Sequence, residues 1–387
     1  MKRAHFILVI ILSAIMAGCG DQRSSDEIIT VDVLKSYPKK ELILQDFLDV
    51  EYIPLDNSDE FVTRGLVGHI SKNLIVVRNS GAGGDIFLFD RKTGKALRKI
   101  NRRGQGPEDY TIPGSIVIDE ENNEMFISDI SSIVVYDLFG NFKRRFNSTD
   151  KYNYSKVVNY DRNHLFFEDG SYIYEEERKN RFRVMSKQDG SITKEIEIPY
   201  KRKVTEYFVS PDGNNSSGPR MQMLVPDHYN NNWTLIETSS DTIYRLLPDF
   251  SMIPMIVRTP SIQSMIPPET FITPFAFTEH YILLQTRSKD RDAFYPRKNL
   301  IWDKKEKAIF ESFIYNTDFL NERPVIFEYE NIIFPFSDSE IAFCERIEAH
   351  ELVEAFKNGQ LKGKLKEIAA NMDDESNPVF MIAKHKK

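Results

Sequence analysis

The stretch IVVYDLFGNFKRRF, residues 133–146, decides the fold. An apolar and aromatic run leads into a polar turn with Asp and Gly, and a second run then mixes aromatic with basic residues. This pattern predicts a β-hairpin. Similar hairpins recur along the chain at a spacing of roughly 50 residues, a period typical of repeat folds. They occupy residues 86–100, 182–198, 242–257 and 299–314.

Two further strand candidates precede each hairpin, as SIVIDE (115–120) and EMFISD (124–129) precede the stretch above. The sequence pattern therefore predicts four short antiparallel strands in each repeat unit. A unit of this kind cannot cover its own faces and must stack on its neighbours, as the blades of a propeller do. Five complete units lie between residues 65 and 315. The predicted fold is all-β: a six-bladed β-propeller of four-stranded antiparallel blades.

The sixth unit draws its strands from both ends of the chain. NIIFPF (331–336) and EIAFCER (340–346) supply its first two strands and residues 378–386 the third. The outermost strand then comes from residues 50–55, and pairing it with 378–386 closes the ring. Closure removes an open sheet edge that would invite aggregation. Residues 28–34, IITVDVL, are interpreted as an additional edge strand.

A helical insertion is predicted at residues 348–372, between the second and third strands of the last unit. Apolar residues such as Leu352 and Phe356 recur there at intervals of three and four. This spacing indicates one or two amphipathic helices, broken near Gly359 or Gly363. We expect them to pack on the propeller, with docking of a partner as the alternative.

The N-terminal residues predict export. Residues 1–18 combine Lys2 and Arg3 with a short apolar core and small residues, which is the pattern of a signal peptide. The end of this segment, Met-Ala-Gly-Cys, resembles a bacterial lipobox, so Cys19 is the predicted site of lipid attachment. Residues 19–27 would form a polar tether. The expected location is the cell envelope with the membrane as a partner; which membrane and which leaflet stay open.

Cysteine content and charge limit the function further. If Cys19 carries lipid, Cys344 has no disulfide partner, and its apolar neighbours predict a buried thiol in a strand. Removal of the signal peptide takes away Lys2 and Arg3, so the formal net charge of −7 becomes −9. An acidic chain without a basic run argues against nucleic acid as a partner.

These features resemble a known family. The lipoprotein signal, the VEYIPLD opening, the GQGP crossover, the VVYDLFGNF hairpin and the SNPVFMIAKHK ending are similar to six-bladed β-propeller lipoproteins of Bacteroidetes, distantly NHL-like. The resemblance covers residues 28–387, nearly the whole mature chain. It implies a fold and an envelope address, but no activity.

The GQGP segment lies in the crossover from the first unit to the second, residues 101–114. Gly104 and Gly106 would permit positive φ angles there, and Pro107 would stiffen the chain. A phosphate-binding loop would require a helix directly afterwards, whereas the next element is an alternating strand. We therefore interpret the segment as a structural crossover.

Strand alternation places the crossovers and the loops between second and third strands on one face. Long charged and aromatic loops on a rigid scaffold are typical of binding sites. We expect this crossover face to bind a glycan, a peptide or an envelope protein without catalysis and without a cofactor. An ordinary solvated rim and a purely structural envelope component are the alternatives. The candidate contacts are Arg102, Arg103, Tyr110, Tyr172, Tyr174, Arg287, Arg291 and Tyr295.

The alternative function is a propeller hydrolase or lyase that uses an axial Ca or Zn ion. Polar residues near the ends of the predicted first strands could serve as ligands, but no closely spaced ligand pair is present. The seven histidines are scattered singly and form no nucleophile–base motif. Whether the protein is an enzyme stays open, with the sequence favouring a binding protein. The possible axial ligands are His69, Asp119, Asn159 and Asp227.

Overall fold

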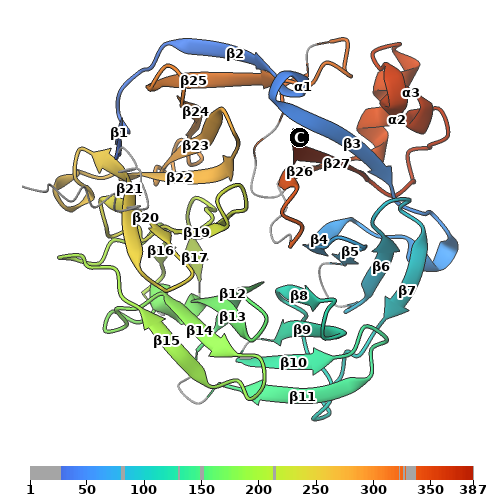
Figure 1. Ribbon diagram of the computed structural model, residues 1–387, viewed down its shortest axis with the longest axis horizontal. Coiled ribbons are helices and arrows are strands. Elements are labelled where there is room, and N and C mark those ends of the chain that lie inside the picture. The colour runs from blue at the N-terminus through green and yellow to red at the C-terminus, as the bar shows by residue number, and fades with distance from the viewer. Residues whose placement is uncertain are drawn as a thin grey trace, which may run out of the picture.

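The computed structural model describes residues 28–79, 83–129, 131–148, 152–211, 215–321, 323–325, 327 and 337–386. The predicted signal peptide and the tether with Cys19 lie outside these residues. Six sheets stand radially around a central axis, and the chain visits them in order (Figure 1). The protein is a six-bladed β-propeller, which confirms the fold predicted from the repeat.

Blades one to three each contain four antiparallel strands, ordered from the axis to the rim. Blade one contains β4 (Leu66–Ile70), β5 (Leu74–Arg78), β6 (Ile86–Asp90) and β7 (Ala96–Ile100). Blade two contains β8 (Ile116–Asp119), β9 (Glu124–Asp129), β10 (Ser132–Tyr136) and β11 (Phe142–Asn147). Blade three contains β12 (Tyr154–Asn159), β13 (His164–Asp169), β14 (Phe182–Ser186) and β15 (Ile192–Ile196).

Blades four and five carry a fifth, parallel strand at the rim, supplied by the N-terminal segment. β1 (Ile29–Asp32) pairs with β21 as the predicted edge strand, and β2 (Lys39–Ile43), which the sequence did not predict, pairs with β25. Blade four contains β18 (Leu224–Asp227), β19 (Asn232–Leu235), β20 (Thr242–Leu246) and β21 (Met252–Thr259). Blade five contains β22 (Thr270–Phe277), β23 (Tyr281–Ser288), β24 (Arg297–Asp303) and β25 (Ala308–Tyr315).

The sixth blade joins the two ends of the described chain. β27 (Val379–His385) lies between β26 (Ile341–Ile347) and β3 (Leu48–Pro54) and is antiparallel to both. Its register with β3 runs from Val379 opposite Pro54 to His385 opposite Leu48. The innermost strand predicted at 331–336 lies outside the described residues.

The predicted helical insertion is present. α2 (Ala349–Lys357) and α3 (Gly363–Ala369) lie between β26 and β27 in the chain and outside the sixth blade (Figure 1). Leu352 and Leu365 are completely buried, so the helices pack on the propeller. A single helical turn, α1 (Leu44–Phe47), connects β2 to β3. None of the described helices has the length and apolarity needed to cross a membrane.

Burial along the strands follows their distance from the axis. β9 and β10 are buried at every position because neighbouring blades cover both of their faces, whereas rim strand β11 alternates between covered and open positions. The turn before β11 needs Gly140, whose φ is +84°, and the pairing of β10 with β11 shifts register beside it. Gly94 and Gly190 occupy the same position in blades one and three. This glycine turn with a bulge makes the repeat visible in the sequence.

The hydrophobic core lies between neighbouring blades rather than inside them. One cluster joins blades one and two, and another joins blades two and three. Cys344 belongs to the cluster between blades six and one and is fully buried, as predicted. Burial raises the pKa of its thiol above the ordinary range.

The crossover at residues 101–114 is held by local hydrogen bonds. The Tyr110 ring is completely buried, and its hydroxyl donates to the Gly84 carbonyl at 2.6 Å. The Asp109 carboxylate accepts a bond from the Gly106 amide at 3.0 Å. A Cβ on Gly104 would lie 2.1 Å from this carboxylate, while no positive φ occurs at Gly104 or Gly106. The prediction of positive φ angles was therefore wrong: Gly104 is needed because Asp109 approaches its backbone closely.

Candidate binding site

A cavity of about 770 Å³ opens at the end of the axis where the first strands begin. Its inner walls come from the start of β4 (Leu66 to Gly68), from Gly114 and Ser115 before β8, and from Ser155 and Lys156 of β12. This is the crossover end of the axis, the face on which the sequence predicted a binding site. We call the cavity the crossover pocket.

Lys156 and Glu168 form the floor of the crossover pocket. They lie opposite each other on β12 and β13. The Lys156 ammonium donates to the Leu224 carbonyl at 3.0 Å and to the Gln222 side-chain oxygen. Burial lowers the pKa of Lys156 to about 8, although the Glu168 carboxylate opposes this shift. Burial also raises the pKa of Glu168, and the nearby Glu206 adds to the rise.

A buried ion pair lies beside this floor. Arg181 and Glu206 are 1% and 2% exposed, and the Arg181 guanidinium contacts the Glu206 carboxylate at 3.0 Å. Thr238 donates a further hydrogen bond to the same carboxylate at 3.2 Å. Arg181 also lies 3.7 Å from the Glu168 carboxylate. The guanidinium thus compensates two carboxylates that would otherwise be costly to bury.

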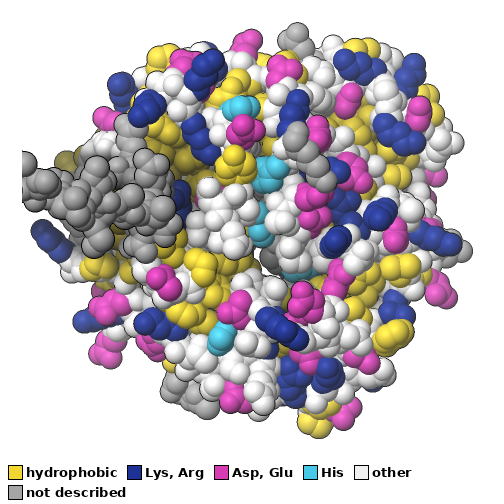
Figure 2. Space-filling model, viewed as in Figure 1, with side chains coloured by type: hydrophobic (Ala, Val, Ile, Leu, Met, Phe, Trp, Pro, Cys, Tyr) yellow, Lys and Arg dark blue, Asp and Glu magenta, His cyan; other side chains and the backbone are white. Residues whose placement is uncertain are grey.

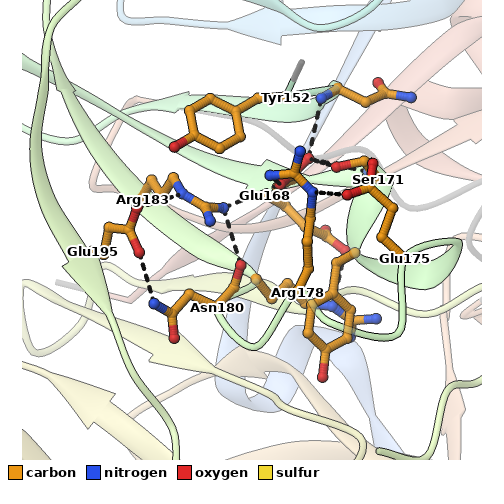
Figure 3. A network of polar contacts seen from close by, with 12 residues as sticks. Tyr152, Glu168, Ser171, Glu175, Arg178, Asn180, Arg183 and Glu195 are labelled. Atoms are coloured by element: carbon orange, nitrogen blue, oxygen red, sulfur yellow. Dashed lines mark hydrogen bonds and ion pairs between the residues drawn. The ribbon is translucent and has the colours of Figure 1, made fainter. Parts of the chain in front are cut away.

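One wall of the crossover pocket is the loop from residue 168 to 180. Asp169 fixes this loop because its completely buried carboxylate accepts hydrogen bonds from Ser171, Arg178 and Arg183 at 2.6, 3.2 and 3.1 Å. Arg178 comes from the loop and Arg183 from β14, and Figure 3 shows both side chains with the Tyr152 ring near them. Such a network of charge-assisted hydrogen bonds holds the wall in one conformation.

The opposite wall is the long crossover from blade three to blade four, residues 197–223. It contains a small hairpin of its own, β16 (Phe208–Val209) with β17 (Ser216–Ser217). The Tyr174 hydroxyl lies 3.1 Å from the Ser216 hydroxyl and connects the two walls. Blade five supports the crossover through Lys289, which donates to the Thr205 carbonyl at 2.8 Å.

The lining of the crossover pocket contains more cations than carboxylates. Glu168 and Glu206 are the two acidic residues that line it, and both lie near Arg181. The cationic residues come from different blades and from the long crossover, and Arg346 also contacts the Glu348 carboxylate at 2.8 Å. They are Arg78, Lys156, Arg220 and Arg346.

The structure brings only part of the predicted residue set to this pocket. Tyr174 lines it, and Tyr172 lies buried behind the wall with its ring 4.6 Å from the Arg181 guanidinium. Neither the three candidates in the first crossover nor the three in blade five are among its lining residues. Contact of these six with a ligand stays a prediction; they are Arg102, Arg103, Tyr110, Arg287, Arg291 and Tyr295.

The first crossover reaches the pocket at its inner end, where Gly114 lines it. It leaves β7, the outermost strand of blade one, and therefore starts at the rim beside the next blade. Arg102 shows this position, because its guanidinium donates to the Gly140 carbonyl in the outer turn of blade two at 2.9 Å. In blade five, Arg287 is largely buried and donates to Gln285 at 2.6 Å.

Sequence reasoning missed Lys156, Glu168 and Glu206. Lys156 could have been found, since a lysine is unexpected within an apolar strand beside the axis. Glu206 could have been found from the length of its crossover, residues 197–223, which is much longer than residues 101–115 between blades one and two. Loops of this length usually carry function.

The proposed axial metal ligands lie at the other end of the first strands and are engaged separately. The Asp119 carboxylate contacts the Lys187 ammonium at 2.6 Å, and Asp227 accepts from the Asn230 amide at 2.7 Å. His69 is buried and lies 3.0 Å from the Ser337 hydroxyl. Across the described ranges, no group of three or more His, Cys, Asp or Glu side chains could hold a metal ion. The axial metal stays a prediction.

Fold and pocket together define a six-bladed β-propeller with a charged cavity at the crossover end of its axis. The chain belongs to the family described as a domain of unknown function, DUF4934, whose model matches residues 28–384. No curated protein matches the chain.

Solved structures of Bacteroides proteins share the fold. A predicted exported protein of Bacteroides fragilis superposes with a TM-score of 0.61 at 16% identity, covering 93% of this chain and 100% of its own. A DUF4221 family member from Bacteroides vulgatus superposes with a TM-score of 0.50 at 11% identity, covering 89% and 99%. At these identities the comparison establishes the propeller architecture.

Proposed function

We propose that the protein is an envelope lipoprotein that binds an anionic glycan in the crossover pocket, without catalysis. The observation that carries the proposal is the convergence of Arg78, Lys156, Arg220 and Arg346 on one cavity. Guanidinium and ammonium groups recognise carboxylate and sulfate groups through charge-assisted hydrogen bonds. The cavity volume is in the range of small-ligand sites.

The envelope location is supported by the sequence and by one relative. The motif ending in Cys19 resembles a lipobox, and the Bacteroides fragilis protein of similar fold is a predicted exported protein. The described chain begins at residue 28, immediately before β1 at the rim of blade four. A lipid on Cys19 would therefore anchor the propeller by its rim.

A glycan fits the crossover pocket better than an extended peptide does. A peptide that binds by adding a strand needs an open sheet edge, and β1 and β2 already cover the rim edges of blades four and five. The pocket instead offers polar groups suited to hydroxyls, among them Asn153, Ser155 and Gln222. Tyr174 and Tyr207 add aromatic rings to its lining.

Calorimetric titration with trigalacturonic acid tests the proposal, with maltotriose as the neutral match. We expect saturable binding of the acidic trisaccharide only, weakened on the order of tenfold or more by Lys156→Ala, since a charged hydrogen bond is lost. Lys194→Ala is the matched control because Lys194 is exposed on rim strand β15, away from the pocket.

Two outcomes would contradict this function. Equal binding of maltotriose would show that charge is not recognised, and unchanged binding by Lys156→Ala would place the acidic ligand elsewhere. Binding of triglutamate in place of acidic sugars would reassign the ligand to a peptide. Sulfated and glucuronate trisaccharides extend the panel if galacturonate fails.

A further inference from the structure

A second cavity, of about 370 Å³, lies at the opposite end of the axis. Its walls come from the ends of the first strands and the turns that follow them, including His69, Asn159 and His228. No residue lines both this cavity and the crossover pocket. Figure 2 views this face of the propeller, on which histidine side chains gather around the central opening. We call this cavity the turn-side pocket.

The turn-side pocket is close to electrically neutral. Lysine and arginine do not occur among the described residues that line it, and Asp161 is its one carboxylate. That carboxylate accepts bonds from the His164 amide at 2.8 Å and from the His164 ring at 2.9 Å. Burial lowers the pKa of His69 to about 3, so its imidazole is uncharged at neutral pH. The turn-side pocket therefore offers no strong attraction to an ionic ligand.

Two aromatic rings are held firmly at this cavity. Tyr160 stacks on Phe250 with ring centroids 5.3 Å apart and an interplanar angle of 13°. Trp233 is half-buried and meets Phe166 edge-on at 6.2 Å. Both Tyr160 and Trp233 also line the cavity. Rigid rings of this kind can cover the C–H face of a sugar ring, because they are large, apolar and already ordered.

Polar groups suited to hydroxyls stand beside these rings. Asn159, Asn231 and Asn232 all line the cavity, and each amide can both donate and accept. The side-chain oxygen of Asn159 is buried and has no hydrogen-bond partner among the residues that the structure describes. Buried acceptors are nearly always satisfied in a functional state, and a ligand hydroxyl would satisfy this one.

We propose that the turn-side pocket is a second binding site, specific for a neutral pyranose sugar. Aromatic rings, amide groups and the absence of charge together match a polyol with one apolar face. The volume is sufficient for a small ligand of this kind. This site is independent of anionic ligand binding at the other end of the axis.

Tryptophan fluorescence tests this site. The protein used contains every residue after the predicted signal peptide. The chain has two tryptophans, so Trp302→Phe leaves Trp233 as the only reporter. Titration with the methyl glycosides of glucose, galactose and mannose should give a saturable change in emission for at least one of them. Saturation-transfer NMR with the same sugars provides a readout that does not depend on tryptophan.

Variants then locate the binding. Asn159→Ala should weaken binding on the order of tenfold while leaving the melting temperature unchanged, because the removed oxygen has no partner in the described part of the chain. Asn163→Ala is the matched control: this exposed asparagine lies in the same turn but does not line the cavity. Trp233→Phe, followed by NMR, should also weaken binding. Lys156→Ala should leave binding intact.

Three results would overturn the proposal. The first is that none of these sugars binds saturably at concentrations up to about 10 mM. A dissociation constant above this concentration is too weak for ordinary recognition. The second is equal binding by the wild type and Asn159→Ala in folded protein. The third is loss of neutral-sugar binding in Lys156→Ala, which would move the sugar to the crossover pocket.

Discussion

The two ends of the propeller axis are built from the same first strands but differ in chemistry. β12 contributes the cation Lys156 to the crossover pocket and the amide Asn159 to the turn-side pocket. At the crossover end, a buried ion pair and several cations surround the cavity. At the turn end, amides and aromatic rings surround a neutral cavity. The propeller scaffold therefore leaves the chemistry of each end free to be chosen separately.

Loop length explains how the crossover end carries its buried ion pair. A buried carboxylate needs several donors around it, and those donors must come from additional chain. The crossover end has that chain in residues 168–180, which lead directly into Arg181, and in residues 197–223, which supply its partner Glu206. At the turn end, only residues 160–163 connect β12 to β13. Buried charges at this end are instead paired between neighbouring blades, as Asp119 is with Lys187 at 2.6 Å.

The largest expected effect is on stability, when the buried ion pair beside the crossover pocket is broken. Arg181→Met leaves Glu206 and Glu168 buried without their cation, and we expect the free energy of unfolding to fall by about 3–5 kcal/mol. Urea unfolding followed by circular dichroism measures this loss. The double variant Arg181→Met with Glu206→Met should recover part of it. A loss below about 1 kcal/mol in the single variant would show that the ion pair is not truly desolvated.

The neutral end should respond to acid through His69. Its folded-state pKa of about 3 lies below the ordinary 6.5 because of burial, so the unfolded chain takes up a proton first as the pH falls. The stability contributed by neutral His69 is complete above pH 6.5. It is lost by up to about 1.4 kcal/mol per pH unit between 6.5 and 3.

Urea midpoints at a series of pH values measure this slope. His69→Gln should flatten it, while His280→Gln, which changes an exposed histidine on the same face, is the matched control. An identical slope in His69→Gln and wild type would mean that other groups govern the acid sensitivity.

The sequence predicted the propeller well because each blade repeats a local pattern. The bulged glycine turn at Gly140, the alternating rim strand after it and the buried strand before it are all set by neighbouring residues. Ring closure followed from the strand character of residues 50–55 and 378–386. The parallel strand β2 was missed, since its half-buried pattern contains no contrast between faces.

The site was predicted only in part because it depends on distant residues. The face followed from strand alternation, and the loop beginning at residue 168 was expected there. The pairing of Lys156 with Glu168 and the burial of Arg181 beside Glu206 arise only when two blades and a crossover meet. Arg102 and Arg103 stood out in the sequence for their charge, but they directly follow the outermost strand of blade one, and Arg102 bonds to the outer turn of blade two.

A smaller effect is expected on ligand affinity when the pH rises, and it should occur only at the crossover pocket. Lys156 has a pKa of about 8, lowered by burial, so its ammonium loses its proton as the pH rises from 7 to 9. Glu168, Glu206 and Glu237 face the same cluster as Arg181, so the loss of the Lys156 charge leaves these carboxylates with less compensation. We expect trigalacturonate binding to weaken on the order of tenfold, the equivalent of one pKa unit.

Calorimetric titrations at pH 7, 8 and 9 test this expectation. Lys156→Arg retains a cation throughout this range and should give a flatter profile. Binding of the methyl glycoside at the turn-side pocket should not change. A fall in both affinities would point to a general loss of structure rather than to Lys156.

The smallest expected effect concerns salt and bears most directly on the contrast between the ends. The cations at the crossover pocket act partly through solvent, and raising sodium chloride from about 0.05 to 0.3 M shortens the screening length by a factor of about 2.5. We expect trigalacturonate affinity to fall a few-fold across this range. Neutral-sugar affinity at the turn-side pocket should stay constant, because no cation lines that cavity among the described residues. Equal salt sensitivity at both ends would mean that the difference in lining charge does not decide which ligand each cavity accepts.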